Sequence, residues 1–83
     1  MRLTYDPRYN IAYIYFQEKS VEVESIRVSE ELTVDLSPDG RIFGIELLNA
    51  NEQLRRGATG EFVVVNEATG ERSEVPIFLQ EAA

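Results

Sequence analysis

The chain has 83 residues with 15 acidic and 8 basic side chains, a formal net charge of −7, and neither cysteine nor histidine. This length predicts a single domain, residues 1–83, with a small core; since disulfides and the usual zinc sites are excluded, we expect a second subunit to supplement that core. The negative field repels phosphate backbones and anionic headgroups, which argues against nucleic-acid and membrane partners.

The sequence also indicates where the protein works. No apolar run approaches the length of a membrane span, and residues 1–5 lack the apolar core of a signal peptide. Small secreted domains are usually stapled by disulfides. Together these features predict a cytoplasmic protein.

The first third of the chain predicts a β-hairpin. Residues 2–5 form a short strand, and the turn formers at 6–10 reverse the chain. Residues 11–16 are β-branched or aromatic almost throughout and have no polar face. This second strand is therefore expected in the centre of a sheet, or completed by another subunit.

Three further strands are predicted before residue 49. In residues 21–28 the apolar positions change parity, so we expect a bulge or break near Glu24 and Ser25. Residues 32–36 and 42–48 alternate apolar and polar side chains, the pattern of strands with one buried face.

The last third predicts one short helix and a second hairpin. Asn49 is a helix-capping type with Glu52 three residues later, so residues 50–56 form a helix that Gly57 ends. Residues 62–65 and 75–79 are apolar and flank a loop that ends at Gly70. The fold class predicted is mainly β (small α+β): an antiparallel β-meander sheet, one short helix after the Gly-Ile-Glu-Leu-Leu strand, and a C-terminal β-hairpin.

The segment from Asp35 to Glu46 has two incompatible interpretations. Asp35, Asp39 and Glu46 stand at the first, fifth and twelfth positions of a calcium loop, with Gly40 at the sixth. Such a loop needs a helix on each side, whereas both flanks have the alternation of strands. The competing interpretation is a tight turn at residues 37–40 joining two strands, and we favour it.

No catalytic constellation is visible in the sequence. Asp6, Asp35, Asp39 and Glu46 are the carboxylates that an acid/base pair would draw on. Solvent-facing acids are expected on a chain this acidic, and no His or Cys suggests a nucleophile. We therefore predict no enzyme activity, no catalytic residues and no cofactor.

Tyr13 and Tyr15 are the predicted interface residues. They have the opposite parity to Ala12 and Ile14, so burying both sets requires material on both faces of the sheet. One small helix covers at most one face. We therefore predict a homodimer with Tyr13 and Tyr15 at the contact.

Several of these motifs resemble those of a known family. The runs Tyr5-Asp6-Pro7, Ala12-Tyr13-Ile14 and Val34-Asp35-Leu36, followed by Asp39-Gly40-Arg41 and Gly44-Ile45-Glu46-Leu47-Leu48, are similar to the prokaryotic domain-of-unknown-function family twenty-two eighty-three. The resemblance covers about residues 2–55, and residues 60–79 are an added C-terminal hairpin. Asn10 stands where that family commonly has Asp.

The resemblance implies no established activity, although some family members look like antitoxins. We therefore predict a non-enzymatic protein-interaction module, with an antitoxin-like partner of a small basic protein as its most concrete version. The alternative is a calcium- or small-ligand-binding domain that uses the Asp35 to Glu46 segment; an uncharacterised hydrolase is a third.

Overall fold

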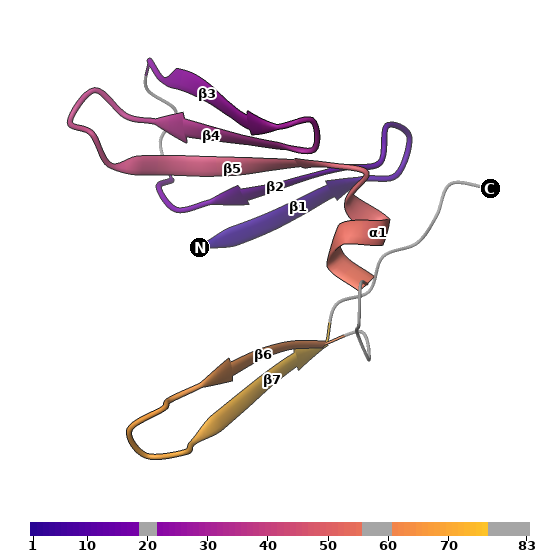
Figure 1. Cartoon of the computed structure of the whole chain (residues 1–83), viewed down its shortest axis with the longest axis vertical. Coiled ribbons are helices and arrows are strands. Elements are labelled where there is room, and N and C mark those ends of the chain that lie inside the picture. The colour runs from indigo at the N-terminus through magenta and orange to yellow at the C-terminus, as the bar shows by residue number, and fades with distance from the viewer. Residues whose placement is uncertain (19–21, 56–60, 77–83) are drawn as a thin grey trace.

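The computed structural model describes residues 1–18, 22–55 and 61–76, which form seven strands and one short helix (Figure 1). The elements in chain order are β1 (Arg2–Asp6), β2 (Ile11–Tyr15), β3 (Glu24–Ser29), β4 (Leu32–Leu36), β5 (Ile42–Leu48), α1 (Ala50–Arg55), β6 (Glu61–Val65) and β7 (Arg72–Pro76). β1 to β5 make one antiparallel sheet, and β6 pairs with β7. The predicted mainly-β fold with one helix and a C-terminal hairpin is confirmed.

The sheet departs from a β-meander at one point. Its order is β1-β2-β5-β4-β3, so β2 pairs with β5 and not with β3. Apart from the tyrosine hydroxyls, both faces of β2 are apolar. The strand is therefore stabilised most when another strand pairs with it on each side. β5 carries the buried Phe43 and Leu47 and fills that central place, whereas every residue of β3 is exposed at the sheet edge.

The turn between β4 and β5 is the tight turn favoured over a calcium loop. The Gly40 amide donates to the Ser37 carbonyl at 2.9 Å, and Gly40 has a φ of 84°. A positive φ suits glycine, which lacks a Cβ. Strands flank this turn on both sides, where a calcium loop of the helix–loop–helix type requires helices.

The phase change in residues 21–28 is resolved differently from the prediction of a bulge near Glu24 and Ser25. β3 begins at Glu24, so Val23 precedes the strand, and Val21 lies outside the described residues. The irregularity comes later, between Arg27 and Ser29, where the register against β4 shifts by one residue. An extra residue at a sheet edge breaks little pairing, which makes the edge strand a favourable place for it.

The start of α1 agrees with the prediction, but its capping group comes from another part of the chain. Asn10, at the end of the β1–β2 turn with a φ of 56°, accepts the Ala50 amide through its carbonyl at 3.0 Å and the Asn51 amide through Oδ1 at 2.8 Å. Its Nδ2 donates to Oδ1 of Asn49 and of Asn51. Asn10 thus fixes α1 to the first hairpin. The predicted helix end at Gly57 lies outside the described residues.

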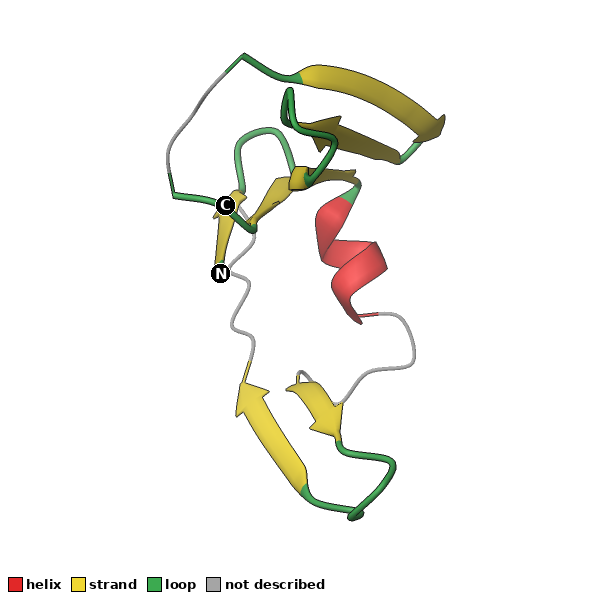
Figure 2. Ribbon diagram, turned by 90° about the vertical axis from the view of Figure 1, so that its left-hand side faces the viewer, coloured by secondary structure: helices red, strands yellow, loops and turns green. Residues whose placement is uncertain are grey.

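Packing against α1 defines the apolar face of the sheet. Residues opposite one another on neighbouring strands point to the same face. One such row is covered by Ala50 and Leu54 of α1, which extends from one side of the sheet (Figure 2). The row consists of Tyr5, Ala12, Leu47 and Leu32. Among the described residues, the buried apolar side chains are few: Ala12, Phe43, Leu47 and Ala50.

The second hairpin forms as predicted around Gly70, whose φ is 78°. Its paired residues are 61–65 and 72–76, and the predicted continuation of the last strand through residues 77–79 lies outside the described residues. Both strands are exposed along their whole length.

Candidate protein-interaction surface

The face of the sheet opposite α1, here called the polar face, carries a hydrogen-bonded network across β2, β4 and β3. The Tyr13 hydroxyl donates to Oδ2 of Asp35 at 2.5 Å, and the Ser25 hydroxyl donates to Oδ1 of the same carboxylate at 2.6 Å. Both oxygens of Asp35 are therefore occupied by donors from this chain. The network thus connects the edge strand β3 with β4 and β2 by side-chain hydrogen bonds.

Gly44 on β5 makes the Tyr13 contact geometrically feasible. Tyr13 and Asp35 lie on strands separated by β5, where Gly44 is opposite both Tyr15 and Asp35. A Cβ at Gly44 would collide with the ring and the hydroxyl of Tyr13. The tyrosine ring thus crosses β5 through the space that glycine leaves open.

Tyr13 and Tyr15, the predicted interface residues, are half-buried neighbours on the polar face. Their ring centroids are 4.4 Å apart, Phe43 lies edge-on 6.1 Å from Tyr15, and the Arg2 guanidinium carbon is 4.3 Å from the Tyr15 centroid. Burial first, and then the hydrogen bond to Asp35, raise the pKa of Tyr13 above its usual range. A phenol in this state is a donor that holds a carboxylate, and it is not a nucleophile at neutral pH.

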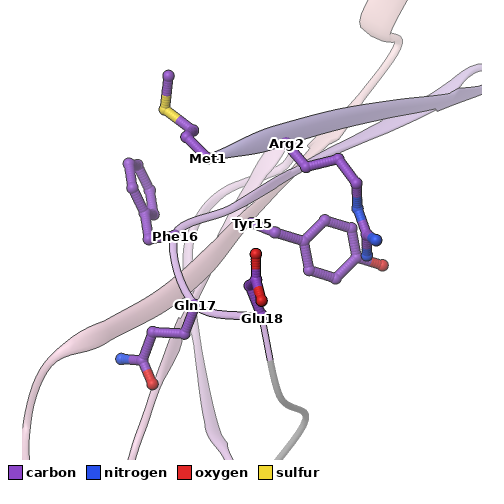
Figure 3. Close-up of a pocket in the computed structure, with 6 residues that line it drawn as sticks. All are labelled: Met1, Arg2, Tyr15, Phe16, Gln17 and Glu18. Carbon is purple, nitrogen blue, oxygen red and sulfur yellow. The ribbon is translucent and has the colours of Figure 1, made fainter.

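A pocket of about 330 Å³ lies at the Tyr15 end of the polar face (Figure 3). Its lining combines two aromatic rings with one cation, one carboxylate and one amide, from Met1, Arg2, Tyr15, Phe16, Gln17 and Glu18. Arg2 lies alongside the Tyr15 ring in this view. The pocket does not include the Tyr13 and Asp35 network, and its wide opening gives it the character of a surface hollow.

The alternative calcium ligands lie apart, and two of them accept hydrogen bonds from within the chain. Asp35 accepts from Tyr13 and Ser25, while Asp39 accepts the Arg41 amide at 3.1 Å within the turn. Glu46 lies opposite Tyr13 and Thr33 in the centre of the sheet. Within residues 1–18, 22–55 and 61–76, no three acidic side chains are grouped so that they could hold a metal ion.

Asp6, the remaining carboxylate considered for catalysis, holds the first turn together. It accepts the Arg8 backbone amide at 2.9 Å and two guanidinium hydrogen bonds at 3.0 and 3.1 Å. The side-chain hydrogen bonds from Arg8 lower the pKa of Asp6. Asp6 is thus a turn residue on β1, on a different strand from Asp35 and Glu46.

On the apolar face, next to the row that α1 covers, the described residues leave part of the surface exposed. A second row crosses all five strands, and we call it the aliphatic row: Leu3, Ile14, Ile45, Val34 and Ile26. Its ends are open, since Leu3 is 39% and Ile26 is 44% exposed, and its three central members are half-buried. A contiguous apolar strip of this kind is typical of an interaction surface.

Reasoning from the sequence identified Tyr13 and Asp35 as candidates but missed Gly44, Asn10 and the aliphatic row. Glycine inside a strand pattern signals a close approach by another group, and Gly44 carried that signal. For Asn10 no local signal existed, because its helix partner is 41 residues away. The aliphatic row exists only in the observed strand order. The meander prediction was wrong about that order, because β2 pairs with β5.

Comparison with known proteins supports the motif-based resemblance. The model of a family described as protein of unknown function (DUF2283) matches residues 2–51, which run from β1 to the start of α1. The β6–β7 hairpin lies beyond the matched residues. No curated protein and no solved structure matches the chain. In the described part of the chain, no helix has both the length and the apolar character needed to cross a bilayer.

Proposed function

This chain belongs to the family of proteins of unknown function DUF2283, and we propose that it is a non-enzymatic protein-interaction module that assembles as a homodimer. The observation that carries the proposal is the aliphatic row, which the described residues leave partly exposed. Burying an apolar side chain stabilises a fold by roughly 1.5–3 kcal/mol. In a single chain the ends of the row stay exposed to water, so a partner that covered them would add to this stabilisation.

The accessible surface of the chain is larger than that of a compact protein of the same mass. A compact protein of 9.5 kDa exposes roughly 5,000 Å², whereas this chain exposes 6524 Å². The radius of gyration, 14.3 Å, also exceeds the value of about 12 Å for a compact domain of this length.

The proposal assigns the contact to the apolar face, and the interface prediction for Tyr13 and Tyr15 stays a prediction. The Tyr13 hydroxyl and both Asp35 oxygens are satisfied within the chain. A partner that covered this face would remove water from these polar groups without offering them new hydrogen bonds, and that desolvation costs free energy. Covering the aliphatic row removes only apolar surface from water.

A matched pair of variants on β1 tests the proposal. Leu3 and Thr4 are adjacent, exposed and on opposite faces of the same edge strand, and Thr4 is opposite Tyr13. Sedimentation velocity should show that Leu3→Asp weakens the dimer by about 100-fold, since an unpaired carboxylate in an apolar contact costs roughly 2–4 kcal/mol. Thr4→Asp should leave it intact.

The two other outcomes contradict the proposal in different ways. A dimer lost with Thr4→Asp and kept with Leu3→Asp would place the contact on the tyrosine side. A wild-type chain that sediments as a monomer at every concentration would remove the homodimer. Ile26→Asp at the opposite edge repeats the test if Leu3→Asp does not fold.

The antitoxin-like version of this module rests on charge. A net charge of −7 attracts a basic partner and speeds its association. A native pull-down of the tagged protein from its own cells, with stoichiometry, tests this version; the cytoplasmic location stays a prediction. Recovery of one small basic protein in fixed ratio supports it, and recovery of the chain's own copies alone contradicts it.

The calcium alternative has less support, because Asp35 and Asp39 already accept hydrogen bonds from within the chain. A ligand that binds only the native state raises the melting temperature. We expect millimolar calcium to leave the melting temperature unchanged. A saturable rise would restore the alternative.

A further inference from the structure

The β6–β7 hairpin has one apolar face. In its register Phe62 is opposite Val75 and Val64 is opposite Ser73, so these side chains share a face. Phe62, Val64 and Val75 are 50%, 52% and 54% exposed. The other face carries Glu61, Arg72 and Glu74 beside two valines, as suits a face turned to water.

This hairpin has no cover of its own in the described structure. In both views it lies beyond the far end of α1, away from the five-stranded sheet (Figures 1 and 2). An isolated two-stranded hairpin is at best marginally stable in water and needs another surface to pack against. The side of the hairpin that contains Phe62 therefore requires a partner.

The aliphatic row matches that requirement in chemistry and in length. Five strands spaced about 4.8 Å apart make a row of roughly 19 Å, and a five-residue hairpin strand is roughly 17 Å long. Both surfaces are apolar; the hairpin face is exposed along its length, and the row is exposed at its two ends. Sheet-on-sheet contacts in which the strands cross at near right angles are an established packing mode.

We infer that the β6–β7 hairpin of one chain packs its Phe62, Val64 and Val75 face onto the aliphatic row of a second copy of this chain. The exchange is reciprocal, since a two-fold dimer uses the same two surfaces twice. It covers both open apolar surfaces and leaves Glu61 and Glu74 in water. This inference rests on the proposed homodimer and names the segments that form it.

The absence of cysteine allows a direct test by cross-linking. One chain carries Val64→Cys, and a co-expressed chain with a different tag carries Ile14→Cys or Val34→Cys in the aliphatic row. A short bifunctional maleimide is added to the purified mixed dimer. Thr33→Cys, on the polar face of β4, is the matched control for the sheet variants.

The inference predicts a covalent dimer between the two tagged chains for Ile14→Cys or Val34→Cys and little for Thr33→Cys. The Val64→Cys chain alone should give no cross-link, because the two hairpins do not face one another. A mixture that is dimeric by mass but links no better through the row than through Thr33→Cys overturns the hairpin exchange and leaves the homodimer standing. A mixture that is monomeric by mass overturns both.

Discussion

At the scale of single residues, the polar face depends on one tyrosine, one aspartate and one glycine. Tyr13 reaches Asp35 only because Gly44 lacks a side chain. Sequence reasoning marked Asp35 as a possible ligand from the spacing of a calcium loop, and Tyr13 as an interface residue from its parity on the strand. Their contact joins positions 22 residues apart across a third strand, and no local pattern encodes such a contact.

Because of Tyr13, the unfolding free energy of the protein should fall as the pH rises in the alkaline range. Its pKa is raised in the folded state, whereas an unfolded tyrosine ionises near pH 10. Its contribution is therefore complete below about pH 10 and is lost as the pH rises toward the folded-state pKa. Urea unfolding between about pH 8 and 11 should show a steeper loss of stability for wild type than for Tyr13→Phe. An equal loss of stability with pH in the two proteins would mean that the folded state does not raise the pKa of Tyr13.

Gly44 and Tyr13 should behave as a coupled pair. Gly44→Ala pushes the tyrosine ring away and breaks its hydrogen bond to Asp35, which we expect to cost roughly 1–3 kcal/mol in unfolding free energy. In a Tyr13→Ala background the same glycine change meets no ring and should cost clearly less. Chemical denaturation of the four variants measures the coupling. Strictly additive effects would show that the ring does not cross Gly44.

At the scale of elements, local patterns located three strands and two glycine turns. Alternation and turn residues placed the strands at 2–5, 32–36 and 42–48 close to their observed bounds, and Gly40 and Gly70 both adopt a positive φ, which suits glycine in a turn. The patterns failed where partners are distant. The pairing of β2 with β5 and the capping of α1 by Asn10 each join residues at least 29 positions apart.

Asn10 should control the docking of α1. Asn10→Ala removes the acceptor of the Asn51 amide, and loss of a helix cap costs roughly 0.5–2 kcal/mol. Asn10→Asp is the matched control, because its carboxylate retains that acceptor while losing the two amide donor contacts. Thermal unfolding should rank wild type first, Asn10→Asp second and Asn10→Ala last. An unchanged midpoint for Asn10→Ala would show that the cap does not hold α1.

At the scale of the whole molecule, the described residues form a small core and leave two apolar surfaces at least partly exposed. The aliphatic row lies on the five-stranded sheet, and the second surface lies on the β6–β7 hairpin. A fold with so few buried side chains gains much of its stability from whatever covers these surfaces. The central claim is that a second copy of the chain does so, and that folding and association are linked.

The most direct test of this claim is the midpoint of thermal unfolding at chain concentrations that span a hundredfold range. Mass action stabilises a dimer by roughly 2.7 kcal/mol over that range, which for a domain of this size should raise the midpoint by about 5 °C or more. A midpoint that rises with concentration is the predicted result. A midpoint independent of concentration, in a protein that unfolds reversibly, would contradict the claim and show that one chain is stable without a partner.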